Sequence, residues 1–289
     1  MSTPFRIACL QMQTGNDLGA NLAAVREMAR EAAANGARFV LTPEYVLMMD
    51  GSGRIMRERA LDAFGNPALP ELQALARELN VWFLAGSLTL RVEDGRIANR
   101  SFLIADDGCV AASYDKIHMF DVTLPDGRAI RESSAYRPGN RAVTAETPWG
   151  RLGLTVCYDL RFPGLYRALA LAGSQFITVP SSFQRQTGKF HWHTLVRARA
   201  IENGCFILAP AMCGEHPGNR QTYGHTLIVD PWGDVLADGG ESPGIVFAEI
   251  DPAAVTRVRA LIPSIEHDRP FSPPATVQAP AEQGLETRD

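Results

Sequence analysis

The hydrophobic positions along the chain follow two different spacings. Residues 5–11 form a short apolar run that favours a strand. From residue 17 to 34, apolar side chains recur at helical spacing, and Asn35-Gly36 is a typical helix end. A second apolar run covers residues 38–42. A strand, a helix and a strand in this order predict two parallel strands joined by a crossover helix.

The rest of the chain alternates in the same way. Further helices are predicted at 54–64, 69–79, from Pro163, at 189–203 and at 252–261, and further strands at 81–90, 97–105, 110–114, 151–156, 176–179, 206–209, 226–229, 234–237 and 245–250. Glu93-Asp94-Gly95 predicts a hairpin turn. Periodicity fails from 118 to 140, and a long irregular segment in a compact enzyme is often a functional loop. We therefore predict one α/β domain with mixed sheets over residues 1–270, and a tail over 271–289 with little apolar content.

Composition narrows the class of protein. The 289 residues carry 28 Lys and Arg against 32 Asp and Glu, a net charge of −4, and no basic stripe points to nucleic acid. The first ten residues lack a secretory signal pattern, and no apolar run reaches the roughly 18 residues of a membrane span. The five cysteines form no disulfide framework. We expect a cytoplasmic protein without nucleic-acid or membrane partners.

Two patterns resemble functional motifs but lack the required context. Residues 240–244 match G-x-S-x-G by letter, but Pro243 has no N–H for an oxyanion and a predicted strand follows. His191 and His193 are two positions apart on a predicted helix, so they point to different faces and cannot hold one ion. No metal site is expected from these motifs.

Three predicted strands end in residues whose chemistry is complementary. Cys157 follows the apolar strand 151–156, Glu44 follows strand 38–42, and Lys116 follows strand 110–114. Each has an ordinary alternative, as a buried small side chain, a solvated acid and a surface amine. Ligands gather at the carboxyl ends of strands in α/β sheets, and a carboxylate can act as base for a thiol. If the strands of Glu44 and Cys157 are parallel neighbours, these side chains meet at one sheet edge.

The same residues carry a family resemblance. Three blocks, in the order Glu, Lys and Cys, resemble the signatures of the nitrilase (carbon–nitrogen hydrolase) superfamily: Leu41-Thr42-Pro43-Glu44, Tyr114-Asp115-Lys116-Ile117-His118 and Cys157-Tyr158-Asp159-Leu160-Arg161-Phe162-Pro163. Further blocks, among them Pro180-Ser181-Ser182-Phe183 and Tyr223-Gly224-His225, are similar to the Nit-type amidases, which include ω-amidases and deaminated glutathione amidases. The resemblance implies a four-layer α-β-β-α sandwich with mixed sheets, a homodimer or higher homo-oligomer, and no cofactor.

The resemblance also implies roles for individual residues. Glu44 would be the general base, Lys116 the cation that stabilises the oxyanion, and Cys157 the nucleophile, with the N–H of Tyr158 completing the oxyanion site. Glu132, inside the irregular segment, fits a second glutamate of the family, although a solvated loop acid is the alternative.

These roles predict a cysteine amidase that hydrolyses the terminal amide of a small carboxylated substrate with water through a thioester. Arg161 could bind the far carboxylate, or could instead be a structural partner of Asp159 or of another acid. A nitrilase, an N-carbamoyl amino acid amidohydrolase and a non-catalytic binding protein on this fold remain alternatives.

Overall fold

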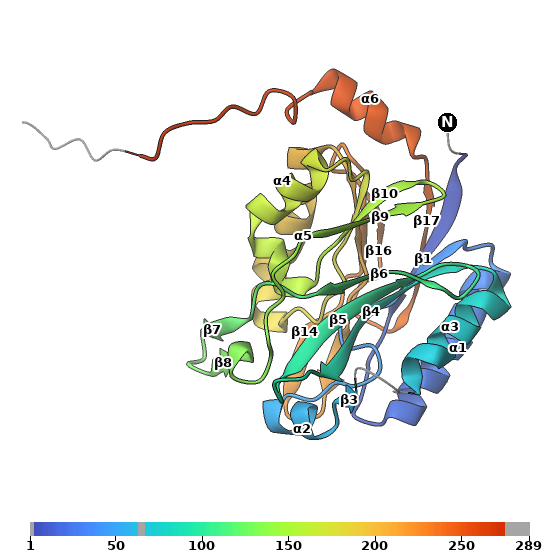
Figure 1. The fold of residues 1–289 in the computed structure, drawn as a ribbon, viewed down its shortest axis with the longest axis vertical. Coiled ribbons are helices and arrows are strands. Elements are labelled where there is room, and N and C mark those ends of the chain that lie inside the picture. The colour runs from blue at the N-terminus through green and yellow to red at the C-terminus, as the bar shows by residue number, and fades with distance from the viewer. Residues whose placement is uncertain (1–2, 63–66, 275–289) are drawn as a thin grey trace, which may run out of the picture.

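The strands of the protein form two large sheets packed face to face, with helices on both outer surfaces. The computed structural model describes residues 3–62 and 67–274. Helices α1 (Leu18–Ala34) and α3 (Ala68–Leu79) lie on the outside of one sheet. Helices α4 (Pro163–Leu171) and α5 (Arg185–Asn203) lie on the opposite side of the molecule (Figure 1). The predicted α-β-β-α sandwich with mixed sheets is therefore confirmed.

The first sheet combines parallel and antiparallel neighbours. In spatial order it contains β17 (Gly244–Ile250), β1 (Phe5–Gln11), β2 (Phe39–Leu41), β4 (Trp82–Arg91), β5 (Ile97–Ile104) and β6 (Val110–Asp115), with β3 (Leu61–Asp62) beside β4. Strands β1, β2 and β4 are parallel, as the crossover pattern predicts. Two antiparallel steps, from β4 to β5 and from β5 to β6, give β6 the direction of β2. The carboxyl ends of β2 and β6 consequently lie at the same end of this sheet.

The second sheet comes from the later part of the chain. In spatial order it contains β16 (Val235–Asp238), β15 (Leu227–Val229), β12 (Phe206–Ala209), β11 (Phe176–Thr178), β10 (Gly150–Leu154) and β9 (Val143–Thr147). Strands β10, β11 and β12 are parallel. Two small hairpins stand apart from both sheets: β7 (Asp121–Thr123) with β8 (Ala129–Arg131), and β13 (Cys213–His216) with β14 (Arg220–Tyr223).

Alternation along the strands builds the layers. In β1, Ile7 belongs to the apolar core shared with the second sheet, whereas Ala8 belongs to the core beneath α1 and α3, and both are fully buried. Successive side chains of a strand point to opposite faces, so a strand covered on both sides must be apolar throughout. Asp17 caps α1 by accepting the backbone N–H of Ala20 at 2.9 Å, as expected for a helix start.

Three sequence predictions differ from the structure. The helix predicted at 54–64 ends much earlier, as α2 (Gly53–Glu58), because Leu61 and Asp62 pair with β4. The segment predicted to be irregular, 118–140, contains the β7–β8 hairpin and a 3₁₀ turn, η1 (Glu132–Ser134). Strands β9, β13 and β14 were not predicted, because their polar side chains give no apolar run.

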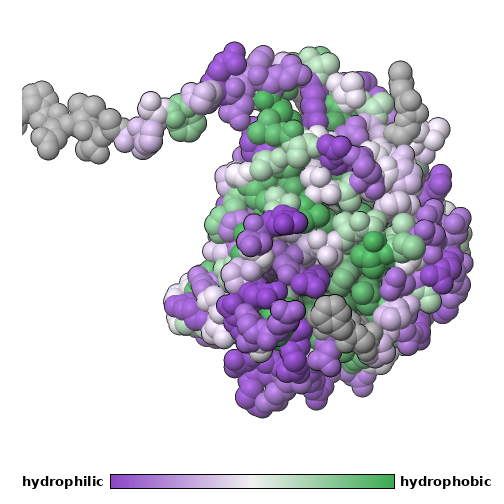
Figure 2. Space-filling model, viewed as in Figure 1, coloured by the Kyte–Doolittle hydropathy of each residue, from purple (hydrophilic) through white to green (hydrophobic). Residues whose placement is uncertain are grey.

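The outer surface differs from one end of the molecule to the other. Figure 2 shows hydrophilic side chains around α2 and the β7–β8 hairpin, and hydrophobic side chains gathered above them. Among the described residues there is no helix both long enough and apolar enough to cross a membrane. After α6 (Ala253–Leu261) the chain runs away from the body (Figure 1), and most of the predicted tail, from 275 onward, lies outside the described residues.

Candidate active site

The three strand-end residues meet between the two sheets. Glu44 follows β2 and Lys116 follows β6, both in the first sheet. Cys157 follows β10, which belongs to the second sheet, and begins the 3₁₀ helix η2 (Cys157–Arg161). The strands before Glu44 and Cys157 are therefore not neighbours in one sheet, and the condition stated for their meeting is not met. The residues come together because the sheets stack face to face, so that the ends of β2, β6 and β10 open on one site.

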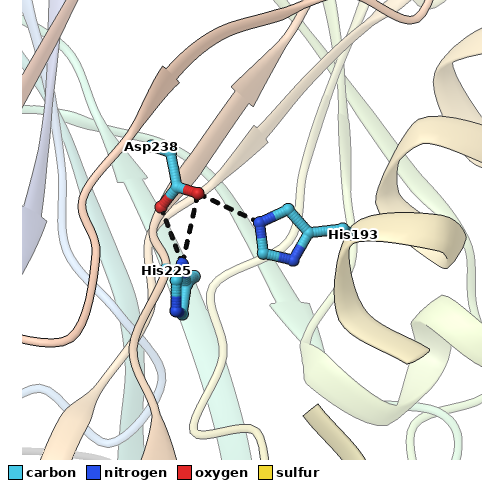
Figure 3. A group of neighbouring side chains, drawn as sticks. All are labelled: His193, His225 and Asp238. Atoms are coloured by element: carbon cyan, nitrogen blue, oxygen red, sulfur yellow. Dashed lines mark hydrogen bonds and ion pairs between the residues drawn. The ribbon is translucent and has the colours of Figure 1, made fainter. Parts of the chain in front are cut away.

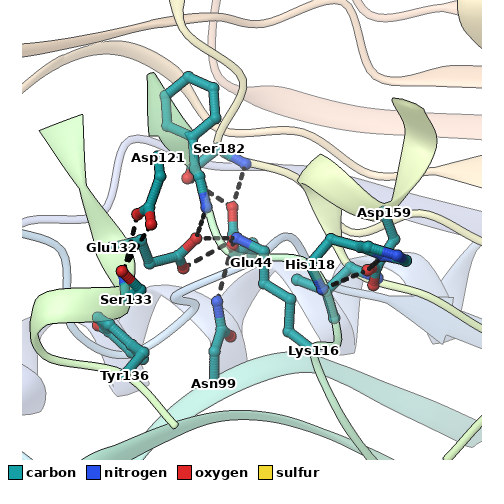
Figure 4. Close-up of polar contacts among 12 residues, drawn as sticks. Glu44, Asn99, Lys116, His118, Asp121, Glu132, Ser133, Tyr136, Asp159 and Ser182 are labelled. Atoms are coloured by element: carbon teal, nitrogen blue, oxygen red, sulfur yellow. Dashed lines mark hydrogen bonds and ion pairs between the residues drawn. The ribbon is translucent and has the colours of Figure 1, made fainter. Parts of the chain in front are cut away.

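Lys116 lies at the centre of the polar network (Figure 4). Its Nζ is 3.0 Å from Glu44 Oε1 and 2.9 Å from both carboxylate oxygens of Glu132. All three side chains are buried, with exposed fractions of 2%, 1% and 9% for Lys116, Glu44 and Glu132. Burial alone favours the neutral amine, but the charges of Glu132 and Glu44 outweigh it and raise the pKa of Lys116 above its ordinary value. Lys116 is therefore a fixed cation.

Glu44 is held by donors on both of its oxygens. Asn99 Nδ2 donates to Oε1 at 2.8 Å, and Ser182 donates to Oε2 from its backbone N at 2.9 Å and from its Oγ at 2.6 Å. Burial favours the neutral acid, but Lys116 and the Ser182 hydrogen bond together lower the pKa of Glu44 below its ordinary value. Glu44 is a carboxylate at neutral pH, and this charge state is the one a general base requires.

Glu132 is fastened in a similar way. Tyr45 OH donates to Oε1 at 3.0 Å and the backbone N of Phe120 donates to Oε2 at 2.6 Å. The solvated alternative for this loop acid does not fit its burial. Since both oxygens of Glu132 also contact Lys116, Glu132 fixes the position of the ammonium group.

Cys157 sits in a strained backbone conformation beside these charges. Its φ of 47° lies in the left-handed region, which is unfavourable for a residue with a Cβ. Its backbone N donates to Pro180 O at 3.0 Å, and the side chain is buried. Burial, then the negative charge of Glu44, raise the pKa of the thiol. The thiol therefore needs a base at the moment it attacks. Tyr158, whose N–H was predicted to join the oxyanion site, follows directly in η2.

Asp159 ties the nucleophile turn to the strand end that carries Lys116. Its carboxylate accepts the Tyr114 hydroxyl at 2.7 Å, the backbone N of His118 at 3.0 Å and the backbone N of Val156 at 2.9 Å (Figure 4 shows the side with His118). Tyr114 and His118 lie two positions before and after Lys116, and Val156 directly precedes Cys157. The alternative pairing of Asp159 with Arg161 is therefore not what the structure shows.

A cavity of about 310 Å³ opens beside Cys157. Its walls include Glu44, Lys116 and Glu132, together with part of the β7–β8 hairpin. The volume is at the small end of the range for ligand pockets. The described lining residues include no histidine. The cavity thus suits a small substrate.

The structure separates two arginines that could face an anionic substrate. Arg161 is not among the described residues that line the cavity: its guanidinium lies over the rings of Tyr158 and Phe183, at 5.9 and 5.4 Å, and 3.3 Å from His191. Arg220, on β14, does line the cavity. Arg161 therefore does not lie at the cavity wall, where its predicted role in substrate binding would require it to be.

Several site residues escaped the sequence analysis. Asn99 lies in the middle of an apolar strand, where one amide gives no signal. Ser182 belongs to a block that was noted only for its resemblance, and Arg220 lies on a short polar strand. A serine pair shortly after a predicted strand, at 176–179, was the one available hint for Ser182.

Comparison with known proteins agrees with this geometry. The family model described as carbon-nitrogen hydrolase matches residues 6–260. A deaminated glutathione amidase from Yersinia enterocolitica is 39% identical over 267 residues, covering 91% of this chain and 92% of the relative.

Two solved structures share the fold. Nit3 from Saccharomyces cerevisiae, a member of branch 10 of the nitrilase superfamily, has a TM-score of 0.83 and 27% identity, covering 91% of this chain and 96% of that one. An amidase from Nesterenkonia sp. AN1, whose structure shows acrylamide added to the active-site cysteine, has a TM-score of 0.76 and 26% identity, covering 89% of this chain and 98% of that one. The resemblance to the nitrilase superfamily is confirmed.

Proposed function

The chain belongs to the carbon-nitrogen hydrolase family, and from this premise we propose that it is an amidase that uses Cys157 to hydrolyse the terminal amide of a short carboxylated substrate. One observation carries the proposal: the buried carboxylate of Glu44 contacts Lys116 and lies near enough to the Cys157 thiol to raise its pKa, at the wall of a small cavity that both residues line. The relatives support it, since they are an amidase of deaminated glutathione and an amidase with an active-site cysteine.

In the first half-reaction, the Cys157 sulfur attacks the amide carbon and Glu44 takes the thiol proton. The carbonyl oxygen becomes negative and is stabilised by Lys116 and by the N–H of Tyr158. The C–N bond then breaks, and Glu44 gives its proton to the nitrogen, which leaves as ammonia. The product is a thioester on Cys157.

In the second half-reaction, Glu44 takes a proton from water as the water oxygen attacks the thioester. The C–S bond breaks, the acid leaves, and the proton returns to the Cys157 sulfur. Lys116 can face the oxyanion because Glu132 holds it through two oxygens, so one contact can be exchanged while the other keeps the ammonium in place.

The carboxylate of the substrate needs a cation, and we assign this role to Arg220. Its Nη2 donates to Ser182 O and Oγ at 2.8 and 3.0 Å, while its Nε is buried without a hydrogen-bond partner among the described residues. A buried donor without a partner costs about 1–3 kcal/mol, and a bound carboxylate would satisfy it. The other cavity cations are engaged: Lys116 by two carboxylates, and Arg131 by the carbonyls of Val122 and Ile130.

A substrate panel tests the proposed activity. With ammonia release as the readout, kcat/KM is expected to be highest for glutaramate, the monoamide of glutaric acid, and lower for pentanamide, pentanenitrile and N-carbamoylglycine. A preference for the nitrile or for the carbamoyl compound would establish one of the alternative chemistries. Binding of these compounds without any turnover would establish a non-catalytic binding protein.

Arg220→Lys is expected to reduce kcat/KM for glutaramate at least about tenfold more than for pentanamide. Lysine keeps the charge but loses the planar fork that matches a carboxylate. The ratio of the two losses is diagnostic, because Arg220 also contacts Ser182 and its loss affects both substrates through Glu44.

Arg161→Lys is the matched control for this prediction, and its effect on the two amides should be equal. Equal losses in Arg220→Lys would contradict the role of Arg220. A loss confined to glutaramate in Arg161→Lys would restore the substrate role first predicted for Arg161.

We also propose that two copies of the chain associate through the surface of α4 and α5. Phe190 and Ile201 on α5 are 77% and 51% exposed, and Leu171 at the end of α4 is 55% exposed. Helices α4 and α5 are neighbours, and large exposed apolar side chains on such a surface are typical of an interface. Light scattering should give twice the 31.5 kDa of the chain, and a smaller mass for Phe190→Glu. A mass of one chain for the wild type would contradict association.

A further inference from the structure

Three potential metal ligands meet on the surface, outside the cavity (Figure 3). His193 comes from α5, His225 from the connection between β14 and β15, and Asp238 from the end of β16. Their ligand atoms all lie within 4.8 Å of one another. His193 Nε2 is 3.0 Å from Asp238 Oδ2, and His225 Nδ1 is 2.9 Å from Asp238 Oδ1. None of the three lines the cavity.

This group differs from the histidine pair considered in the sequence. His191 and His193 do point apart, as their spacing requires: His191 Nδ1 lies 3.3 Å from Arg161 Nη2, whereas His193 faces Asp238. The partners of His193 are 32 and 45 residues away in the chain, at positions 225 and 238, and only the fold reveals them.

The position of His225 is fixed by its own backbone. Its N donates to Gly240 O at 2.6 Å, its O accepts the indole N–H of Trp192 at 2.7 Å, and its φ of 52° lies in the left-handed region. The ring stacks on Tyr223, with the centroids 4.4 Å apart. A strained residue held by several contacts is often found at a functional position.

The carboxylate of Asp238 is oriented as well. Its Oδ1 accepts the backbone N–H of Gly240 at 2.9 Å, so Gly240 contacts both Asp238 and His225. Partners that orient ligands in this way are a regular feature of metal sites, where they fix the direction of each lone pair. Two imidazoles and one carboxylate, each fixed by its own element, thus converge on one point.

We propose that His193, His225 and Asp238 form a binding site for a divalent zinc-class ion. Two imidazoles with one carboxylate suit Zn²⁺, with water in the fourth position. In a tetrahedral site with bonds of about 2.1 Å, ligand atoms lie roughly 3.4 Å apart, so the separations here need to change by little more than an ångström. His193 Nε2 and His225 Nδ1 would offer lone pairs to the ion, and each neutral ring would carry its proton on the other nitrogen.

The ion would join α5 to the edge of the second sheet, next to a cavity wall. Gln184 and Thr187, at the start of α5, line the cavity, and Gln184 forms a β-bridge to Thr222 of β14. Strand β14 also carries Arg220. The proposed site is therefore structural: it lies behind the elements that shape the cavity and supplies no group to the reaction.

Equilibrium dialysis of the full-length chain against Zn²⁺ tests this site, with the Tm measured with and without zinc as a second readout. The wild type should retain one equivalent of zinc, and its Tm should rise with zinc because the ion binds the folded state. His193→Gln, His225→Asn and Asp238→Asn should each weaken binding at least about tenfold and lose the Tm shift. Asparagine tolerates the left-handed backbone at position 225, so that variant keeps its fold.

Two controls locate the ion. His191→Gln, two residues along the same helix, should retain zinc, and so should Cys157→Ala, which removes the thiol of the cavity. The proposal is contradicted if the wild type retains no zinc equivalent, if the three ligand variants retain it, or if either control loses it.

Discussion

Cys157→Ala is expected to abolish ammonia release while leaving the fold intact. Without the sulfur there is no atom to form the covalent intermediate. A water molecule in its place would not be held in position to attack the amide carbon. The fold should persist because alanine is smaller than cysteine and meets the same left-handed backbone, at a φ of 47°, without additional strain. Ammonia assays with glutaramate and a thermal melt measure the two parts of this prediction.

The matched control is Cys109→Ala, because Cys109 is an exposed cysteine that is not among the described residues lining the cavity. It should keep wild-type activity. Cys157→Ser should be nearly as inactive as the alanine variant, since a hydroxyl is a much weaker nucleophile next to this base. Wild-type ammonia release by Cys157→Ala would end the cysteine-amidase account.

Glu44→Gln is expected to lower kcat by about 10²–10⁴, the usual loss when a general base is removed. The amide can still contact Asn99, Ser182 or Lys116, so the side chain stays in place, but it cannot take the thiol proton. The high pKa of the Cys157 thiol makes this loss severe, because little thiolate forms without a base. Steady-state kinetics with glutaramate, beside the exposed control Glu93→Gln, measure the effect. More than a tenth of wild-type activity would contradict the role of Glu44.

Substitutions of Lys116 and Glu132 should differ from Glu44→Gln in their effects on rate and stability. Lys116→Ala removes an oxyanion donor, at a cost of about 10²–10³ in rate. It also leaves Glu44 and Glu132 buried together without a cation, which typically destabilises a protein by about 3–5 kcal/mol. Glu132→Gln should reduce activity by weakening the hold on Lys116 while costing less stability. Measuring kcat and the free energy of unfolding for these variants and for Glu44→Gln separates the effect of lost charge balance from the effect of the lost base.

The sequence predicted the parts of the site that follow strand chemistry. Glu44, Lys116 and Cys157 were found because each follows a predicted strand, and ligands gather at the carboxyl ends of strands in α/β folds. Whether their strands are neighbours in one sheet was left open, because sheet membership depends on pairing between distant strands, which no local pattern encodes. Glu44 and Cys157 follow strands that belong to different sheets.

The site residues that were not predicted are single polar residues whose roles depend on tertiary contacts. Asn99 is one amide in an apolar strand, and Arg220 is one cation on a polar hairpin, and neither pattern differs from an ordinary surface or core position. The contact between His193, His225 and Asp238 joins three segments that share no motif. The segment 118–140 was correctly singled out as unusual, but its hairpin was hidden because a two-stranded ribbon outside the core needs no apolar periodicity.

The central claim is that the acyl group passes through the sulfur of Cys157. Reactions of glutaramate with the wild type and with Glu44→Gln can be quenched in acid, digested and examined by mass spectrometry, with ammonia measured in the same samples. The account predicts an adduct with the mass of the substrate less ammonia, on the peptide that contains Cys157. Ammonia release by the wild type with that peptide unmodified in both proteins, or an adduct on a different residue, would contradict it.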